Sequence, residues 1–374
     1  MEIHSGMAVA AWMVFPAPLQ ALALLAVPLC EGWGLWLVLP AILGVMQALR
    51  VIRADRWAWA SLVAGVTTMV WATAPLRALV PVAVTEAADI SVWRALVAGL
   101  EGDVVVTPQT HEFHRDGDVV LQLDALIPDG TGPFPTAVVV HPGGWRGGDK
   151  SDFPEGNAWL LQRGFAVFDV QYRLEPAPNW KAAVGDVKCA IRWVKRNAER
   201  FHLRDDGLTL LGRSAGAHLV MLVAGTPGHP LLPSTCEGDD PAVKQVVAFY
   251  GPTDLVYGYH NPANLLVYDG PATLRRFLGT TPDEDRMLYE LMSPVTHVTP
   301  RMPRTLLFHG AADQYVRVRQ MELMVERLKT MRVEHRAVVL PHAQHGFDFA
   351  VRGLGWQLAS EVMGQFLDVA RDGG

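Results

Sequence analysis

The sequence "LTLLGRSAGAHL" places one serine between two glycines directly after an apolar run. The spacing Gly212-x-Ser214-x-Gly216 is typical of a nucleophile elbow, a sharp turn between a strand and a helix that lifts the serine hydroxyl clear of the sheet. The glycines let the backbone turn and let the strand and the helix pack closely. A glycine-rich helix start without chemistry would look the same in isolation, but the position between a strand and a helix predicts a serine nucleophile.

A serine hydroxyl is a weak nucleophile at neutral pH and needs a base. With this elbow, the expected order along the chain is serine, then an acid, then histidine. Asp313 follows the apolar run "RTLLFHG", and His345 follows the next run, "EHRAVVLP". We therefore expect His345 to take the proton of Ser214, and Asp313 to hold the imidazole in the required tautomer.

Three other residues are alternatives for these two roles. His342 lies in the same loop as His345 and is the alternative base, but a solvated loop histidine explains it equally well. Asp254 and Asp348 are alternative acids. Asp254, in "YGPTDL", also fits an Asx turn or a helix cap.

The stretch "VVVHPGGWRGGDK" ends a buried apolar run in a loop that carries few side chains. Preorganised backbone N–H groups stabilise the negative charge that develops on a carbonyl oxygen under attack. We predict Gly143, Gly144 and Ala215 as the donors, because Pro142 has no N–H. Trp145, beside this loop, is expected to line the substrate pocket.

From about residue 103 onward, short apolar runs alternate with helical stretches, which predicts an α/β fold with a mostly parallel, eight-stranded sheet. The expected strands are 103–107, 119–127, 136–141, 165–173, 208–212, 245–251, 304–310 and 334–341. The expected helices are 155–163, 180–200, 215–224, 271–278, 317–330 and 354–370. In such sheets ligands bind beyond the carboxyl ends of the strands, and the three candidate catalytic residues all follow predicted strands.

Residues from about 100 to 370 resemble the α/β-hydrolase esterases, specifically the bacterial carboxylesterase and feruloyl-esterase-like branch next to the hormone-sensitive-lipase group. The matching stretches are "HPGGWRGGDK", "VQYRLEPAPNWKAAVGDVKCAIRWVKRNA", "GRSAGAHL", "YGPTDL", "LLFHGAADQYVRV" and "HAQHGFDF". The resemblance implies a triad of Ser214, Asp313 and His345 and an acyl-enzyme that water hydrolyses. Two positions depart from the family pattern: Pro142 replaces the first glycine of an HGGG motif, and Arg213 precedes the serine, in a role that stays open.

The resemblance also implies that residues 252–300, the longest stretch without a clear strand, cover the acyl pocket as a cap. We expect Tyr257 and Tyr259 to contact the substrate. The alternative is a solvated connector with aromatic anchors. No cluster of His, Cys or acidic residues has the spacing of metal ligands, so no metal or other cofactor is expected.

The first 84 residues hold only seven charged side chains, which is typical of a membrane region. Three uncharged stretches, residues 7–29, 33–49 and 57–76, predict three transmembrane helices, because about 20 apolar residues cross a bilayer. A soluble helical domain is the alternative. A cleaved signal peptide is disfavoured because "MEIHSG" lacks Lys and Arg. The expected organisation is a membrane region over 1–84, a linker over 85–102 and a hydrolase domain over 103–374.

The membrane helices also resemble, more distantly, those of the eukaryotic prenylcysteine methylesterases. Arg50, Arg53 and Arg56 lie in the second connection, which the positive-inside rule places in the cytoplasm. The catalytic domain of this multi-pass cell-membrane protein is then extracytoplasmic. There, Cys189 and Cys236 would form a disulfide, or they are two unrelated thiols.

The net charge of −6 and the absence of a basic run give no reason to expect a nucleic-acid partner. The sequence therefore predicts a membrane-anchored serine esterase acting on a small-molecule or lipid ester. The alternatives are a membrane acyltransferase with the same acyl-enzyme, and a non-catalytic binding protein on a hydrolase fold. The complete set of serine, acid and histidine disfavours the second.

Overall fold

The computed structural model describes residues 33–51, 57–97, 106–238 and 243–372. Its centre is an eight-stranded sheet in the order β1-β2-β4-β3-β5-β6-β7-β8; β2 runs antiparallel to both of its neighbours, β1 and β4, and all other adjacent strands are parallel. The strands are β1 (Gln109–Asp116), β2 (Val119–Leu126), β3 (Thr136–Val140), β4 (Ala166–Val170), β5 (Leu208–Arg213), β6 (Val243–Phe249), β7 (Arg304–Gly310) and β8 (His335–Leu340). The predicted α/β-hydrolase sheet is confirmed.

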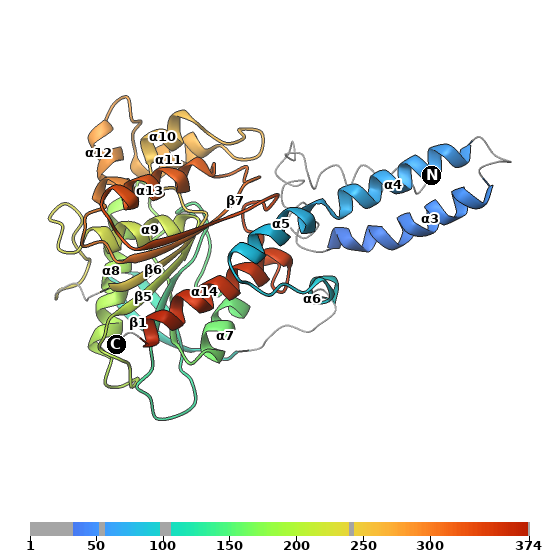
Figure 1. The fold of residues 1–374 in the computed structure, drawn as a ribbon. Helices are drawn as coiled ribbons and strands as arrows, with labels where there is room; N and C mark the ends of the chain where they lie inside the picture. The colour runs from blue at the N-terminus through green and yellow to red at the C-terminus, as the bar shows by residue number, and fades with distance from the viewer. Residues whose placement is uncertain (1–32, 52–56, 98–105, 239–242, 373–374) are drawn as a thin grey trace.

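Helices cover both faces of the sheet, which explains why the central strands are continuous apolar runs. Every residue of β3 is buried; Val138 and Val140 join one hydrophobic cluster, and Ala137 and Val139 join the other. One face carries α8 (Trp180–Arg196), α9 (Ala215–Gly225) and α13 (Arg319–Thr330). The opposite face carries α5 (Ala74–Thr85), α7 (Pro154–Gln162) and α14 (Leu354–Asp372) (Figure 1).

The first strand differs from the prediction. The predicted strand 103–107 falls largely outside the described residues, and its last two residues, Val106 and Thr107, are not in a strand. The strand at this edge is β1, with the polar sequence "QTHEFHRD", in which Phe113 alone is buried. An edge strand with both faces near solvent has no continuous apolar run, so hydrophobicity did not indicate it.

A helical cap lies over the carboxyl ends of the strands (Figure 1). It contains α10 (Leu255–His260), α11 (Gly270–Leu278), α12 (Arg286–Leu291) and the 3-10 helix η2 (Pro294–His297). An aspartate caps the N-terminus of each α-helix of the cap. Asp254, Asp269 and Asp285 each accept a hydrogen bond from the amide three residues ahead. Asp254 is therefore a helix cap, as its alternative interpretation proposed, and not the acid of the site.

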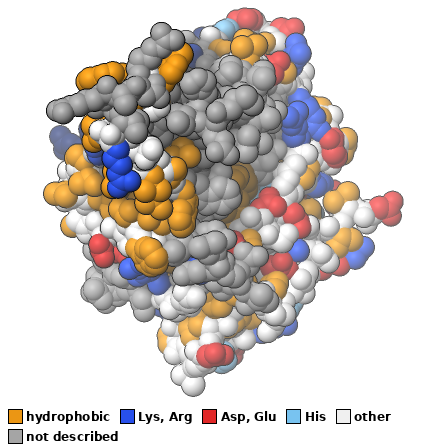
Figure 2. Space-filling model, turned by 90° about the vertical axis from the view of Figure 1, so that its right-hand side faces the viewer, with side chains coloured by type: hydrophobic (Ala, Val, Ile, Leu, Met, Phe, Trp, Pro, Cys, Tyr) orange, Lys and Arg blue, Asp and Glu red, His pale blue; other side chains and the backbone are white. Residues whose placement is uncertain are grey.

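Two N-terminal helices form a hairpin that projects from the hydrolase domain (Figure 1). The 3-10 helix η1 (Trp33–Leu37) leads into α3 (Val38–Val51), which packs along α4 (Trp57–Ala72). The contact is close: a Cβ on Gly65 would lie 3.0 Å from the carbonyl oxygen of Ala41. Large apolar side chains face outward from both helices, namely Trp36, Leu39, Ile42, Leu43, Met46, Leu49, Trp57, Trp59, Val63, Val66 and Val70. Figure 2, which views the molecule from the hairpin's side, shows hydrophobic side chains gathered on this face.

Among the described residues, one helical stretch, Trp57–Thr85, is long and apolar enough to cross a membrane by length and composition. It contains α4 and α5 and extends beyond the predicted third span. The second predicted span coincides with η1 and α3, a shorter apolar helix. The first predicted span, residues 7–29, lies outside the described residues.

Helix α5 and the residues after it pack onto the hydrolase domain. Leu79 and Ala83 are buried in the same cluster as α14, and Glu86 pairs with Arg336 of β8 at 2.5 Å. The amide of Ser91, just before the short helix α6 (Val92–Val97), donates to the side chain of Gln357 at 2.6 Å. Packing onto the hydrolase domain thus begins in α5. The domain boundary near residue 85 stays a prediction.

We expect Leu79→Ala to lower the free energy of unfolding by about 2–5 kcal/mol, because it removes a buried side chain and leaves a cavity under α14. Val80 is the matched control, since it is 43% exposed on the same helix and Val80→Ala removes little buried surface. Denaturant unfolding of the full chain measures both changes. Equal effects of the two substitutions would contradict the docking of α5.

Candidate active site

Ser214 lies in a strained turn between β5 and α9. Its φ of 52° and ψ of −116° lie outside the regions that a residue with a side chain normally adopts. Both flanking glycines are required by close backbone packing: a Cβ on Gly212 would lie 2.4 Å from the oxygen of Gly216, and one on Gly216 would lie 2.1 Å from the oxygen of Val140. The predicted elbow is present, and it directs the serine side chain into a cavity.

The structure brings the three predicted catalytic residues together in one hydrogen-bonded chain. Nε2 of His345 lies 3.0 Å from Oγ of Ser214, and Nδ1 of His345 lies 2.7 Å from Oδ2 of Asp313. The other carboxylate oxygen of Asp313 accepts the amides of Tyr315 and Val316 at 2.8 and 2.9 Å. These distances fit a nucleophile, a base and an orienting acid.

Asp313 is fully buried yet keeps its charge. Burial alone would raise its pKa, but the positive field of His345 and the hydrogen bonds from His309 and His345 outweigh burial and hold the pKa of Asp313 well below its usual range. Nε2 of His309 lies 3.3 Å from Oδ2 of Asp313. His309 was not singled out from the sequence, although its position in "LLFHGAAD" places it at the end of the strand that leads to Asp313.

The alternative residues lie elsewhere. His342 sits beside α5, where it lines a small cavity with Pro75 and Leu79, and burial lowers its pKa. Asp348 pairs with Arg213 at 2.5 Å inside the core and does not contact His345 by a hydrogen bond. Asp313 and His345, the acid and the base expected from the order along the chain, are therefore the residues that the structure joins to Ser214.

Two tyrosine rings contact the imidazole of His345. The ring of Tyr315 stacks on it with centroids 4.9 Å apart, and the ring of Tyr250 lies 4.4 Å away. Neither tyrosine was predicted from the sequence. Because both rings restrict rotation of the imidazole, they help to hold its Nε2 toward Ser214.

The glycine-rich loop after β3 faces the serine. Gly143 and Gly144 have φ values of 115° and 60°, and a Cβ on Gly143 would overlap the carbonyl oxygen of Gly147. Gly143, Gly144 and Ala215 line the same cavity as Ser214 and His345. Within the described part of the chain, the amides of these three residues donate to no protein acceptor. They are thus placed to donate to a bound oxygen.

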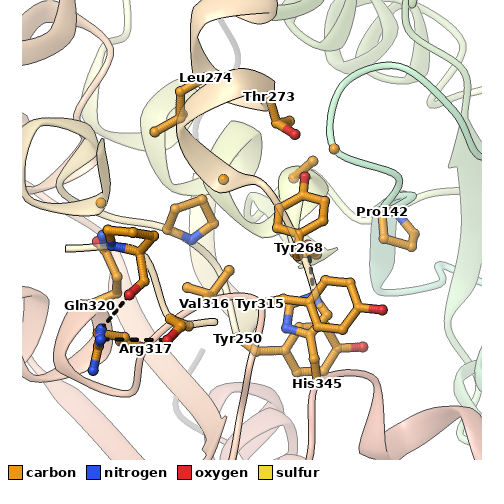
Figure 3. A pocket seen from close by; sticks show the side chains of 18 of the residues that line it. Pro142, Tyr250, Tyr268, Thr273, Leu274, Tyr315, Val316, Arg317, Gln320 and His345 are labelled. Carbon is orange, nitrogen blue, oxygen red and sulfur yellow. Dashed lines mark hydrogen bonds between the residues drawn. The ribbon is translucent and has the colours of Figure 1, made fainter. Parts of the chain in front are cut away.

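The cavity above Ser214 has a volume of about 320 Å³ (Figure 3). Apolar and aromatic groups dominate its lining, which includes Pro252, Pro262, Ala263, Leu274, Tyr268, Tyr315, Val316 and Phe349. Arg146 and Arg317 also line it, and the Arg317 guanidinium donates to the carbonyl of Pro262 at 2.9 Å. Such a cavity fits a mainly apolar ligand with a few polar groups.

The prediction that Tyr257 and Tyr259 contact the substrate is corrected by the position of α10. Gly258, between them, lines the cavity, whereas the two tyrosines do not. Successive helix residues point about 100° apart, so only one of three neighbours faces the pocket. Tyr259 instead packs against Tyr289 of the cap, with centroids 5.8 Å apart.

Trp145 lines the cavity as predicted and is held from two sides. Its ring stacks on Phe277 of α11 at 4.4 Å, and its Nε1–H donates to Nδ1 of His218 at 3.3 Å. The other nitrogen of His218 donates to the carbonyl of Met292 at 2.7 Å, which fixes the neutral tautomer. Burial lowers the pKa of His218 to about 4, although the hydrogen bond to Met292 opposes this shift. His218 therefore joins Trp145, next to the glycine-rich loop after β3, to the cap while uncharged.

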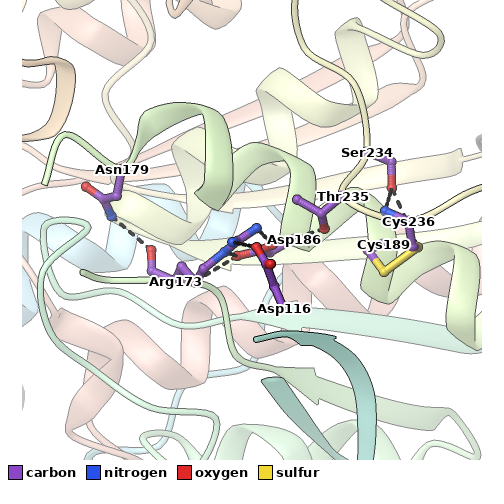
Figure 4. A network of polar contacts seen from close by, with 8 residues as sticks. All are labelled: Asp116, Arg173, Asn179, Asp186, Cys189, Ser234, Thr235 and Cys236. Atoms are coloured by element: carbon purple, nitrogen blue, oxygen red, sulfur yellow. Dashed lines mark hydrogen bonds and ion pairs between the residues drawn. A yellow bond between two sulfur atoms is a disulfide. The ribbon is translucent and has the colours of Figure 1, made fainter. Parts of the chain in front are cut away.

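A polar network that includes Asn179, Arg173 and Asp186 holds the backbone of Trp145 (Figure 4). Asn179 donates to the carbonyls of Trp145 and Arg173, both at 2.9 Å. The guanidinium of Arg173 donates two hydrogen bonds to the buried carboxylate of Asp186, each at 2.8 Å, and Asp186 also accepts from Thr235 at 3.0 Å. The wall of the cavity is thus tied to the loop that follows α9.

Cys189 and Cys236 form a disulfide next to this network, with their Cα atoms 5.2 Å apart (Figure 4). The pairing that the sequence left open is therefore present in the structure, and it joins α8 to the loop after α9. Among the described residues, no group of three or more His, Cys, Asp or Glu side chains is placed to hold a metal ion.

The sheet order, the strained serine turn and the cap together define an α/β hydrolase. The chain belongs to the BD-FAE family, whose model matches residues 123–328. The protein named "Probable carboxylic ester hydrolase LipM" of Mycobacterium tuberculosis is 31% identical over 229 residues, which cover 59% of this chain and 51% of LipM. The resemblance to carboxylesterases stated from the sequence is confirmed.

Two further comparisons extend this result. A rice protein named "Probable isoprenylcysteine alpha-carbonyl methylesterase ICMEL1" is 27% identical over 219 residues, covering 56% of this chain and 50% of that one. The solved structure of an esterase from Thermogutta terrifontis, Est2 with propionate bound, is 25% identical with a TM-score of 0.59, covering 70% of this chain and 94% of Est2. The chain spans about half the length of the curated relatives it matches.

The low pKa of His218 predicts a specific loss of stability in acid. Between pH 6.5 and 4 the unfolded chain binds a proton at this position and the folded chain does not, so the free energy of unfolding falls as the pH falls through this range. The loss attributable to His218 is ~3 kcal/mol.

Unfolding curves at pH 7 and pH 4 measure this loss, and His218→Gln should reduce it. His202→Asn is the control, because His202 is exposed and Asn tolerates its left-handed backbone, with φ of 51°. If the wild type and His218→Gln lost the same free energy on acidification, the neutral buried state of His218 would be wrong.

Proposed function

We propose that this protein is a serine esterase that hydrolyses carboxylic esters through an acyl-enzyme. The observation that carries the proposal is the hydrogen-bonded chain from Ser214 through His345 to Asp313 at the floor of the cavity. Membership of a family whose relatives bear esterase names supports the same chemistry.

In the proposed reaction, the ester carbonyl carbon lies above Oγ of Ser214. As Oγ attacks, Nε2 of His345 takes its proton, and the charged Asp313 stabilises the resulting imidazolium. The amides of Gly143, Gly144 and Ala215 hold the oxyanion, a contribution of about 2.7–4 kcal/mol for each donor whose removal has been measured in other enzymes. The imidazolium then protonates the leaving alcohol, and water activated by His345 releases the acid.

The proposed substrate is an uncharged ester with an apolar acyl or alcohol group. The apolar lining of the cavity supports this, because such a surface gains free energy from burying hydrocarbon. Est2 of Thermogutta terrifontis, which has propionate bound, supports a carboxylic acid as one product.

The proposal includes anchoring in the cell membrane by three helices, with the catalytic domain outside. The apolar outward faces of α3 and α4, and the small residues Ala41 and Gly65 at their contact, are typical of helix pairs in a bilayer. The arginines of the second connection support a cytoplasmic position for it. The disulfide between Cys189 and Cys236 supports an oxidising compartment for the catalytic domain.

We expect Ser214→Ala to reduce hydrolysis of p-nitrophenyl esters by several orders of magnitude without unfolding the protein, because Ser214 supplies the hydroxyl that is hydrogen-bonded to Nε2 of His345. His345→Ala should be similarly impaired, whereas His342→Ala, the matched control in the same loop, should retain most activity. Steady-state kinetics with circular dichroism measures this. Activity of Ser214→Ala within tenfold of the wild type would overturn the proposal.

The proposed topology predicts the thiol count of protein isolated from its native membrane. Under denaturing conditions one thiol, that of Cys30, should react without reductant, and all three cysteines should react after reduction, because Cys189 and Cys236 are bridged. Mass spectrometry after alkylation gives the count. Three reactive thiols without reductant would contradict the extracytoplasmic position.

A further inference from the structure

A buried ion pair lies directly beside the serine and the histidine. Arg213 is the last residue of β5 and precedes Ser214, and Asp348 follows His345 by three residues. Nε of Arg213 lies 2.5 Å from Oδ2 of Asp348, and the two side chains are only 2% and 0% exposed. Because burying two charges costs free energy that their attraction often only just offsets, such a pair is weak evidence for a stabilising role.

Tyr250 completes this group. Its hydroxyl donates to Oδ1 of Asp348 at 2.5 Å, so each carboxylate oxygen has its own donor. The ring of the same tyrosine is tilted against that of His345, with centroids 4.4 Å apart. Tyr250 adopts φ of 41°, a left-handed conformation that is strained for a bulky residue and persists only where its surroundings enforce it.

The guanidinium of Arg213 has little freedom to move. It lies 4.1 Å from the ring centroid of Phe153 and 5.2 Å from that of Phe249. A Cβ on Gly156 would lie 3.0 Å from Nη2 of Arg213, so α7 also closes around it. The position of Asp348 is therefore fixed relative to the end of β5.

The pair joins two parts of the sheet that are not neighbours. In the strand order, β6 and β7 separate β5, which carries Ser214, from β8, which leads to His345. The strand β8 is at the edge of the sheet, and the loop after it takes a left-handed turn at Gly346, with φ of 76°. The contact between Arg213 and Asp348 therefore spans the two intervening strands and links the ends that lead to Ser214 and His345.

We propose that Arg213 and Asp348, with Tyr250, are positioning residues that hold the histidine loop at hydrogen-bonding distance from Ser214. The inference rests on the esterase function proposed above. Arg213 touches no reacting atom; it acts through Asp348 and the loop. The ionisable side chains that interact with the group are those of Asp169, Asp313 and His345, in addition to Tyr250.

The test replaces the whole pair by apolar side chains in Arg213→Met/Asp348→Leu, so that no unpaired charge stays buried. A pair that only stabilises the fold can be exchanged in this way at little cost in stability. We expect the double variant to fold but to lose about 10–100-fold in kcat, with KM within about twofold, because a misplacement of about 1 Å costs this much in rate. The acid limb of its pH–rate profile should also shift, because the surroundings of His345 change.

Two milder variants keep the test decisive if the double variant does not fold. Tyr250→Phe removes one hydrogen bond to Asp348 and leaves the ion pair, and it should lower kcat severalfold. Arg213→Lys keeps the charge and should retain more activity than Arg213→Met. The control is Lys244→Met/Asp206→Leu. It removes an ion pair of 2.6 Å that lies where β5 and β6 begin, at the end of these strands away from Ser214, and it should leave kcat unchanged.

The outcomes separate this inference from the proposed function. Wild-type hydrolysis that disappears in Ser214→Ala establishes the esterase; kcat within threefold of the wild type in folded Arg213→Met/Asp348→Leu then overturns the positioning role. If wild-type protein hydrolyses no ester, the proposed function fails, and NMR of labelled histidine still tests the positioning. The resonance of the His345 Nδ1 proton should shift in the double variant and in Tyr250→Phe, and unchanged resonances would overturn the inference.

Discussion

The approach of α9 to β3 is the constraint on which the geometry of the site depends. A side chain on Gly216 would lie 2.1 Å from the carbonyl oxygen of Val140, and one on Gly212 would meet the backbone of Gly216. Because these backbones touch, the turn between them is forced into the strained conformation of Ser214. The same approach places the amide of Ala215 beside the glycine loop that follows β3. One steric condition therefore positions the serine and the candidate oxyanion donors together.

Two aspartates near His345 have different roles, which their partners determine. Asp313 shares its oxygens with His345, His309 and two backbone amides, and this keeps it charged despite full burial. Asp348 is equally buried but is neutralised by Arg213. A single acid in place of the two would have to pair with both Arg213 and His345. In the proposed mechanism, this division lets Asp313 stabilise the imidazolium of His345 while Asp348 holds the loop.

The parts of the structure that follow from local pattern were predictable, and those that depend on distance between segments were not. Continuous apolar runs indicated the buried strands, and the elbow motif with the chain order of acid and base indicated Ser214, Asp313 and His345. The edge strand β1 has too few apolar residues to be recognised. The contacts of Tyr250 and Tyr315 with His345 join β6, β7 and β8, and no sequence spacing encodes them. Similarly, the cysteines were visible, but their distance of 5.2 Å was not.

The hairpin and the histidine loop are mechanically connected through α5. The amide of Thr73 donates to Met69 and the amide of Arg77 donates to Thr73, so the helical hydrogen bonds continue from α4 into α5. Helix α5 then packs against the residues just before His345, where Leu79 lies beside Ala343. A continuous helix transmits orientation, whereas a flexible linker does not. Helix α5 therefore links the hairpin to the loop that carries His345. Under the proposed membrane anchoring, this link would hold the hydrolase domain at a defined angle to the bilayer.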